Sequence, residues 1–503
     1  MNKRLAAFAN LVHGITTLGI SIVVGLVMVP IYLRFFNAGV YGAWLASGGL
    51  IAMLALVESG LSTVVTQRLA AAIADNNSSE FAEVAGTGIF MAALLGIGVF
   101  IVGSGLAFAI SSMFGVASLE KAALTNAIML SSLANGTMIV SYTIGAVPQA
   151  WQKTTFPCVV GIVAQASCPV AIIVGLANEW GVAALAFGPL AVALTYLVGN
   201  GFYVAANWKR VGVPRPFVSR KAQSELWRSS YKLLGAKAAG SICSRLEAPA
   251  AAIAVSNEAA TVLVLTGRFL NLVPMLVERV ASATFAGLAH FTNRTTEERL
   301  RVFRELLTVI NAFTGIGLGI AFAFTGPVLR LWVGENLYAG HGLAMLILIC
   351  CLFMTRMTSL SNILLSNGFT SDSAQWMTAY SILRVACLVV LSGVFGLAGI
   401  AGAGALAAGI TMFGVAHAVQ QRLGMPMSEA FKTGSRSTIV CVLLGTGWAL
   451  FGPQAESWIG LSFQIGAAGS LLFVVTLVLD AEWNIAFRQN IRVLGNRFAR
   501  VTT

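Results

Sequence analysis

The sequence contains few charged residues and very few acidic ones. Only 10% of its 503 residues are charged, with 19 Asp and Glu against 31 Lys and Arg. So few polar groups cannot cover the surface of a water-soluble protein of this size, which excludes an ordinary soluble domain. Apolar residues make up 57% of the chain and the mean hydropathy is +0.84. These values are typical of a polytopic membrane protein.

Motifs for disulfide formation and metal binding are also missing. The seven cysteines lie in or beside apolar runs and include no C-x-x-C pair. Small packing residues are the simplest interpretation of such cysteines. We therefore predict no disulfide framework, no metal and no cofactor. The net charge of +12 is spread along the chain in a way that argues against a nucleic-acid partner.

Long apolar runs dominate the rest of the sequence. Each is long enough for a helix of roughly 20 residues to cross the hydrocarbon of a bilayer, and none shows the strict alternation of barrel strands. We therefore predict an all-α membrane protein with about 14 transmembrane helices. The predicted spans include residues 41–70, 233–255, 376–396 and 400–421.

A basic, proline-containing connection divides the spans into six before it and eight after it. We predict an N-terminal lobe over residues 1–208, a cytoplasmic linker over 209–232, a C-terminal lobe over 233–427, an additional helix pair over 437–480 and a tail over 481–503. The tail carries apolar residues at steps of four and three with arginines between them. It is therefore expected to form a basic amphipathic helix that anchors the chain to the membrane surface or binds a partner.

The distribution of Lys and Arg predicts the orientation. With both termini in the cytoplasm, only Arg34, Lys121 and Arg330 of the 31 basic residues fall on the opposite face, apart from those inside spans. Cytoplasmic connections carry the excess of basic residues in membrane proteins. We expect a multi-pass protein of the bacterial inner membrane with both termini cytoplasmic.

Two polar turns indicate an internal duplication. Asn77 with Glu80, and Thr295 with Glu298, have the spacing of a helix N-cap and its third residue, and the two pairs are 218 residues apart. A repeated six-helix unit would explain the match.

Six basic side chains lie inside apolar runs of the second half of the chain, where an Arg or Lys costs about 2.5–3.5 kcal/mol unless water or an anion offsets it. They are Lys237, Arg245, Arg268, Arg279, Arg356 and Arg384, and the only embedded acids are Glu58, Glu247 and Glu278. The excess of positive charge predicts a hydrated cavity for an anionic ligand. Guanidinium groups offer forked donors that suit phosphate.

Structural roles remain open for several of these residues. Lys237 can extend its amine to the interface. Arg279 can pair with Glu278, and Arg245 with Glu247. Glu58 can take up a coupling proton or form an ion pair with one of the cations.

The segment Phe36–Ala70 carries a family resemblance. Tyr41-Gly42, Trp44, Glu58-Ser59-Gly60-Leu61 and Arg68 are similar to the first-hairpin pattern of the polysaccharide transporter family. These are the O-antigen and exopolysaccharide flippases of the multidrug/oligosaccharidyl-lipid/polysaccharide exporter superfamily. The resemblance implies two six-helix lobes around a central cavity plus a C-terminal helix pair.

The resemblance also implies a function, which is transport and not enzymatic catalysis. An undecaprenyl-diphosphate-linked glycan would move from the cytoplasmic to the periplasmic leaflet by alternating access, with the six cations on its diphosphate. Membrane lipids, a glycan polymerase and glycosyltransferases would be its partners.

Three alternatives stay open. A multidrug exporter of the same superfamily would share the fold, although such exporters often use an acidic residue in the first span, where this chain has none. Lipid II as cargo is disfavoured because its flippases carry arginines in the first helices. A membrane-embedded glycan polymerase or ligase would need a sizeable outer loop, and a scaffold or scramblase would leave the embedded charges unexplained.

Overall fold

The computed structural model describes residues 3–54, 56, 60–114, 118–153, 155–208, 214–289, 296–453 and 455–479. Over these ranges the secondary structure is α-helical with one short 3-10 helix, and no strand is present. The chain divides into two compact units, Met1–Thr261 and Val262–Thr503, which are called unit 1 and unit 2 below.

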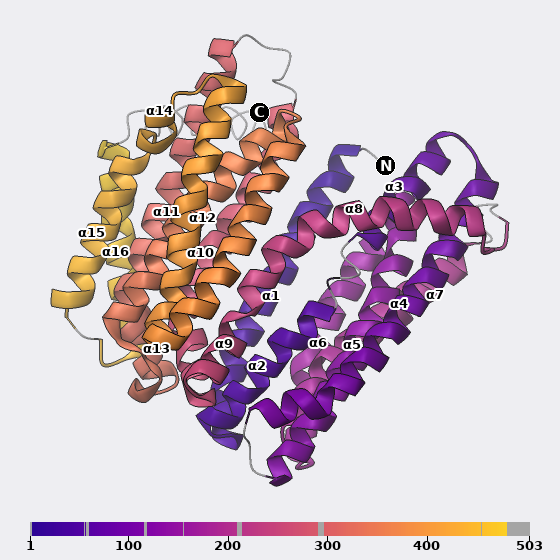
Figure 1. The fold of residues 1–503 in the computed structure, drawn as a ribbon, viewed down its shortest axis with the longest axis horizontal. Coiled ribbons are helices and arrows are strands. Elements are labelled where there is room, and N and C mark those ends of the chain that lie inside the picture. The colour runs from indigo at the N-terminus through magenta and orange to yellow at the C-terminus, as the bar shows by residue number, and fades with distance from the viewer. Residues whose placement is uncertain are drawn as a thin grey trace, which may run out of the picture. The chain divides into compact units, whose positions relative to one another are not determined.

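Unit 1 is a bundle of long helices. Its helices are α1 Lys3–Phe35, α2 Ala38–Leu54, α3 Leu61–Ala74, α4 Ser78–Met113, α5 Ser118–Ala150, α6 Thr155–Ala177, α7 Ala183–Trp208, α8 Arg220–Arg245 and α9 Glu247–Ala254. Helix α5 packs against α4 and α7, and α7 also packs against α6 (Figure 1). One core cluster joins α3, α4 and α5 with Leu226 of α8.

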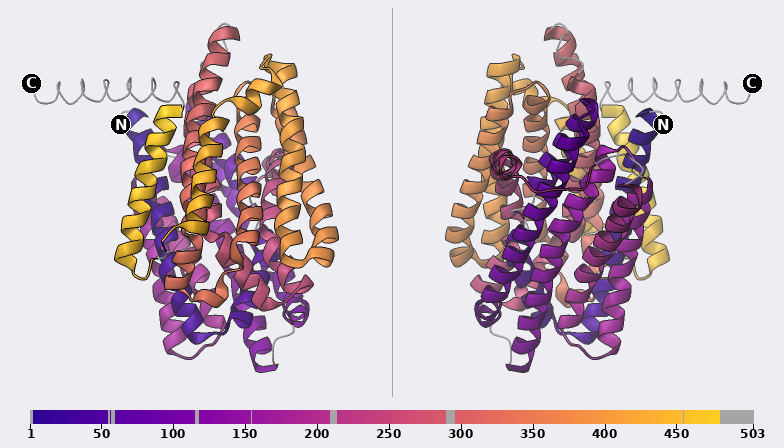
Figure 2. Two further views of the ribbon diagram at one scale, coloured as in Figure 1. Left: turned by 90° about the vertical axis from the view of Figure 1, so that its left-hand side faces the viewer. Right: turned by 90° about the vertical axis from the view of Figure 1, so that its right-hand side faces the viewer.

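Unit 2 contains the remaining helices. They are α10 Asn257–Ala289, which begins in unit 1, then α11 Thr296–Trp332, the 3-10 helix η3 Glu335–Leu337, α12 Gly340–Ser366, α13 Thr370–Leu423, α14 Met427–Lys432, α15 Ser435–Phe451 and α16 Trp458–Leu479. Helix α11 packs against both α15 and α16, as Figure 2 shows, and α12 packs against α13. The main core of this unit includes Met357 of α12 and Tyr380 of α13, which are both fully buried.

The prediction of an all-α, multi-pass membrane protein is confirmed. Ten helices in the described part of the chain are long and apolar enough to cross a membrane, and three shorter apolar helices lie in α1, α2 and α3. The longest, α13, has 54 residues and changes direction at Gly396, whose φ is 56° and ψ is −131°. This position separates the two spans predicted over 376–396 and 400–421.

Two predicted spans each contain a break. The span over 41–70 is two helices, α2 and α3. The span over 233–255 is the second half of α8 followed by α9, with Leu246 between them. The second break has a local cause, because Pro249 has no N–H to donate to the carbonyl of Arg245 and so interrupts the helical hydrogen-bond ladder.

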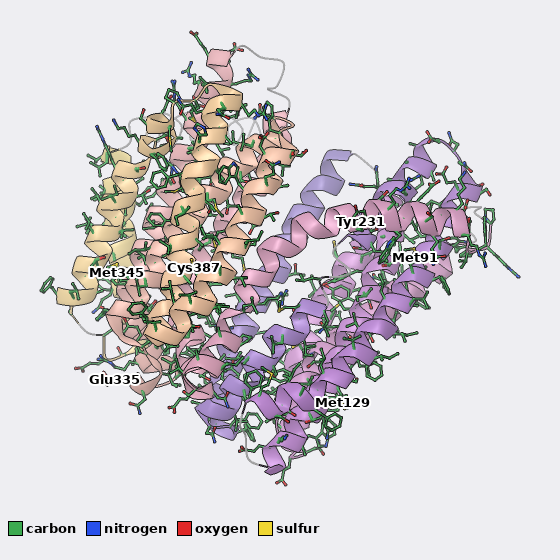
Figure 3. The ribbon with its side chains drawn as sticks, in the orientation of Figure 1. Met91, Met129, Tyr231, Glu335, Met345 and Cys387 are labelled. Atoms are coloured by element: carbon green, nitrogen blue, oxygen red, sulfur yellow. The ribbon has the colours of Figure 1, made fainter. Side chains whose placement is uncertain are left out.

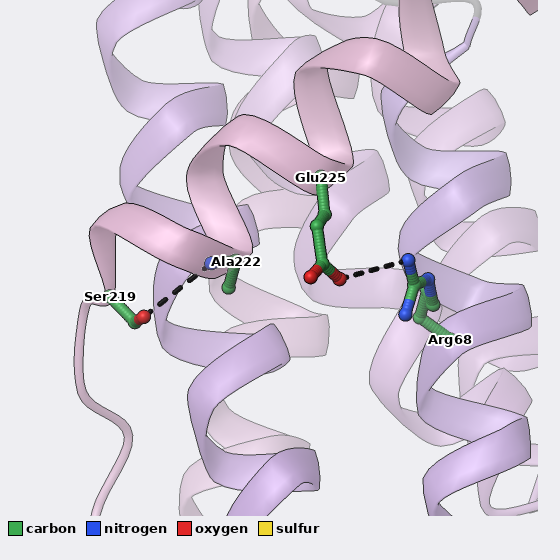
Figure 4. A network of polar contacts seen from close by, with 4 residues as sticks. All are labelled: Arg68, Ser219, Ala222 and Glu225. Atoms are coloured by element: carbon green, nitrogen blue, oxygen red, sulfur yellow. Dashed lines mark hydrogen bonds and ion pairs between the residues drawn. The ribbon is translucent and has the colours of Figure 1, made fainter.

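The predicted linker over 209–232 includes the beginning of a helix. Residues 220–232 are the beginning of α8, and the described linker residues before it, 214–219, form no regular element. Ser219 caps the helix, since its hydroxyl accepts a hydrogen bond from the Ala222 N–H at 3.4 Å (Figure 4). Arg68 of α3 forms an ion pair with Glu225 of α8 at 3.1 Å, which joins these two helices.

Helix boundaries in the two halves follow the predicted offset. Helices α4 and α11 begin at Ser78 and Thr296, 218 residues apart. Helices α7 and α13 end at Trp208 and Leu423, 215 residues apart. Boundaries that recur at this distance support the interpretation of a duplicated unit.

The predicted cap at Asn77 is present. Its side-chain oxygen accepts a hydrogen bond from the Glu80 N–H at 3.1 Å. Because this bond satisfies a free N–H of the first turn, Asn77→Ala is expected to lower the free energy of unfolding by about 1 kcal/mol. Thermal unfolding in detergent measures the effect, with the exposed neighbour Ser79→Ala as control. Equal melting of the two variants would show that the cap contributes nothing.

Candidate anion-binding residues

The six predicted cations lie on four helices. Lys237 and Arg245 are in α8, Arg268 and Arg279 in α10, Arg356 in α12 and Arg384 in α13. The side chains of Lys237 and Arg279, and the whole of Glu58, are outside the described part of the structure. Their predicted roles in ligand binding and ion coupling therefore stay predictions.

Arg268 lies on the side of α10 opposite to Val277. Val277 packs with Ile310 of α11, and it follows Arg268 by nine residues, which places the two side chains roughly 180° apart on α10. Arg268 is half-buried near the middle of a span that runs from Asn257 to Glu278. It forms no hydrogen bond or ion pair with any residue that the structure describes, so its five donors are available to a ligand.

Arg356 is buried, with 7% of its surface exposed. Its Nη2 donates a hydrogen bond to the Thr433 carbonyl at 3.0 Å, while Nη1 has no hydrogen-bond partner. The Thr433 carbonyl also accepts from Asn311 Nδ2 at 3.0 Å. Thr433 ends α14, where a cation is favourable because the last carbonyls of a helix are unpaired and carry partial negative charge. Arg356 therefore joins α12 to the end of α14 and keeps one donor group free.

Arg384 is also buried, with 4% of its surface exposed. Its guanidinium donates to the Tyr380 hydroxyl, one helical turn earlier, and lies 5.7 Å from the centre of that ring. A Cβ added at Gly404 would lie 3.5 Å from Arg384 Nη2. The guanidinium therefore lies beside Gly404, on the second limb of α13, where the closest atom to an added Cβ would be Cys350 Sγ at 2.8 Å.

The remaining charged residues lie near helix ends. Arg245 is the last residue of α8 and is exposed, while Glu247 is half-buried in the first turn of α9. Glu278, in α10, is exposed. Within the described ranges Arg245 takes part in no ion pair, so the expected pairing with Glu247 is not formed.

A polar pocket at one end of unit 2 was not predicted. It is lined by residues of α11, the η3 segment, α12 and α15, including Arg330, Glu335, Tyr338, His341 and Trp448. Glu335 is labelled in Figure 3 at the end of unit 2 opposite to the α14 label of Figure 1. Arg330 pairs with Glu335 at 3.3 Å, and Tyr338 bonds His341 Nδ1 at 3.0 Å. Burial raises the pKa of Tyr338 to about 12, so its hydroxyl stays protonated at neutral pH.

The sequence contains only a weak signal for this pocket. Tyr338 and His341 are three residues apart near a predicted span end, but Trp448 comes more than 100 residues later. Only the packing of α11 against α15 brings these parts together.

Neither a known family model nor any curated protein sequence matches this chain. Solved structures do match. The lipid II flippase MurJ in an inward closed conformation gives a TM-score of 0.70 at 14% identity and covers 95% of this chain and 99% of that chain. A multidrug resistance MATE family transporter of the MOP superfamily in its inward-facing conformation gives a TM-score of 0.67 at 13% identity. The match covers 83% of this chain and 96% of that chain.

A MOP superfamily transporter from Pyrococcus furiosus gives a TM-score of 0.58 at 13% identity, over 92% of this chain and 96% of that chain. This chain has the fold of the MOP superfamily. The fold agrees with the multidrug/oligosaccharidyl-lipid/polysaccharide exporter superfamily predicted from the first hairpin, and membership of that superfamily and of the polysaccharide transporter family within it stays a prediction.

Proposed function

We propose that this protein is a flippase that moves an undecaprenyl-diphosphate-linked oligosaccharide, an O-antigen or exopolysaccharide repeat unit, from the cytoplasmic to the periplasmic leaflet. The MOP fold supports transport as the general activity. The charge of the embedded residues supports an anionic cargo. A rocking motion of two lobes would give access to each side in turn.

The single observation that carries the choice of cargo is the unneutralised Arg268. A guanidinium at mid-span costs several kcal/mol unless water or an anion accompanies it. No described carboxylate lies within ion-pair distance of Arg268 or Arg356, and Arg356 Nη1 lacks a partner. A diphosphate supplies several acceptor oxygens for such donors, often in forked geometry.

The acidic residues of unit 2 favour the same conclusion. Helix α12 contains no acid, and α13 contains only Asp372, in its first turn. Asp372 is already paired with Arg422 at 3.2 Å. A cationic drug would need a free carboxylate in these spans. The Pyrococcus furiosus transporter is described as having a binding pocket of reverse polarity, and we propose that charge sign selects the cargo here as well.

If the proposal holds, enzymes that build the transported glycan act before and after this protein. Glycosyltransferases would supply the lipid-linked unit on the cytoplasmic side, and a glycan polymerase would consume it on the other side. The undecaprenyl chain would remain in the bilayer, because its hydrocarbon gains nothing from leaving lipid.

Reconstituted vesicles test the cargo class. A fluorescent lipid-diphosphate oligosaccharide is expected to exchange between leaflets at least about tenfold faster with the protein than without it, which corresponds to about 1.4 kcal/mol in the barrier. The cation ethidium should not be transported in the same vesicles under an imposed proton or sodium gradient. Transport of ethidium without movement of the lipid-diphosphate would overturn the proposal in favour of drug export.

A further inference from the structure

The first half of α8 packs one of its faces against α3 and α4. Its inward positions are Ala222, Leu226 and Ser230, which are all buried. The Ser219 N–H before the helix donates to Thr87 Oγ1 of α4 at 3.1 Å. The backbone of Ser230 lies so close to Gly60 that a Cβ added there would be 2.4 Å from the Ser230 carbonyl oxygen. These contacts set the rotation of α8 about its own axis.

The opposite face of this segment is exposed and combines aromatic with basic residues. It consists of Arg220, Ser224, Trp227, Arg228 and Tyr231. At about 100° per residue these five side chains cover an arc of roughly 100°. Trp227 and Tyr231 are 53% and 58% exposed. Figure 3 labels Tyr231 on α8.

The charge of this face is uniformly positive. The only acid between residues 214 and 231 is Glu225, and it is turned toward Arg68 of α3 (Figure 4). Lys221 borders a groove that also contains Glu80 and Glu83, so nearby acids offset its charge. Arg220 and Arg228 form no ion pair with described residues.

We propose that this face of α8 is a docking surface for anionic phospholipid headgroups. Arginine binds lipid phosphate, and Trp and Tyr favour the depth of the headgroups because their rings have an apolar body and a polar edge. Basic residues beside an anionic leaflet add electrostatic attraction. The surface consists of other residues than the cations on α10 and α12. The proposal therefore does not depend on the identity of the cargo.

The course of α8 places these residues at the correct depth. The helix runs without a break from Arg220 to Arg245, and its second half begins the apolar segment predicted to enter the bilayer at residue 233. Trp227 precedes that point by six residues, or about 9 Å along the axis at 1.5 Å per residue. Trp227 therefore lies within about 9 Å of the predicted edge of the hydrocarbon, which is close to the depth of the headgroups.

Quenching of Trp227 by brominated lipids tests the proposal in the full-length protein. Nanodiscs contain phosphatidylglycerol and phosphatidylcholine, with one lipid brominated at a time, and subtraction of a Trp227→Phe variant isolates the emission of Trp227. Brominated phosphatidylglycerol is expected to quench Trp227 several-fold more strongly than brominated phosphatidylcholine. Higher ionic strength should reduce the difference, because the attraction is electrostatic.

Paired charge variants assign the preference to this face. Arg220→Gln with Arg228→Gln is expected to reduce the preference for phosphatidylglycerol by roughly fivefold or more, the effect of about one or two basic residues at an anionic surface. Lys432→Gln with Arg436→Gln removes two exposed charges elsewhere and should leave the preference unchanged. All of these side chains are exposed, so folding should be retained, as elution of a monodisperse peak would verify.

Three results would overturn the proposal. Equal quenching by both lipids in the unmodified protein would mean that the face does not select anionic headgroups. An absence of quenching by either lipid would mean that it contacts water or protein. Displacement of phosphatidylglycerol by a short-chain polyprenyl diphosphate would assign the face to cargo binding.

Discussion

Replacing Arg268 with alanine is expected to reduce transport of a lipid-diphosphate glycan by about 10- to 100-fold, while folded protein is retained. A hydrogen bond to a charged group contributes about 1.5–3 kcal/mol, and each 1.4 kcal/mol is a factor of ten. Arg268 makes no hydrogen bond or ion pair with the described residues that its removal would break, and it lies on the side of α10 opposite to the Val277–Ile310 contact. Display of glycan on cells and flux in vesicles, each normalised to protein amount, measure the effect.

Conservative and matched variants sharpen this test. Arg268→Lys keeps the charge but loses the forked donors, so an intermediate loss is expected. Arg330→Ala removes another partly exposed arginine, which is paired with Glu335 outside the spans, and should leave transport nearly unchanged. Normal glycan display with Arg268→Ala, or an equal loss with Arg330→Ala, would remove Arg268 from the transport mechanism.

Arg356 is a less direct test of whether the embedded cations bind the cargo. Its guanidinium holds the Thr433 carbonyl, so Arg356→Ala would remove a structural contact together with any ligand contact. The carbonyl would keep only its bond from Asn311. A loss of transport in that variant alone would not separate binding from stability, whereas Arg268 has no such second role in unit 2.

Gly42→Ala is expected to be the most destabilising single substitution in α2. A Cβ at this position would lie 1.7 Å from the Asn257 carbonyl oxygen and 2.9 Å from Thr261 Oγ1. Backbone atoms cannot rotate away, so the start of α10 must move from α2 and strain the 2.6 Å hydrogen bond from Thr261 to the Ala38 carbonyl. Overpacking of this kind costs about 1–3 kcal/mol, which predicts a fall of roughly 2–10 °C in the unfolding midpoint.

The same helix contains a matched control. A Cβ at Gly48 would meet nothing within 4 Å, and alanine is the better helix former by about 1 kcal/mol. Gly48→Ala should therefore melt at or slightly above the temperature of the unmodified protein. Thermal unfolding in one detergent compares the two, and coincident melting of Gly42→Ala and Gly48→Ala would show that the close approach at Gly42 is not required.

Much of the fold could be predicted from hydropathy. A membrane span satisfies its backbone hydrogen bonds within one helix, so each span is encoded by a local run of apolar residues. The cap at Asn77 could be recognised for the same reason, because it depends on neighbouring positions. The 218-residue offset followed from finding the same local pattern twice. Breaks within apolar runs were missed. Leu246 separates α8 from α9 just before Pro249, and the mean hydropathy of the run does not register such a break.

The candidate site was only partly accessible to the same reasoning. The embedded cations are visible in the sequence because each lies in an apolar run, but their surroundings depend on distant segments. Arg356 contacts Thr433, which is 77 residues away. Arg384 lies beside Gly404, on the other limb of α13 and 20 residues later in the chain. Neither relation has a local pattern.

The sequence by itself determined that this is an all-α membrane protein with an excess of positive charge in its later spans, because apolar length and charge sign are properties of composition. Only the tertiary structure decided which cations acquire partners and which face of α8 remains exposed. Helix packing is the reason. A guanidinium gains hydrogen bonds only where other helices place acceptors beside it. Those helices come from segments that are far apart in the chain.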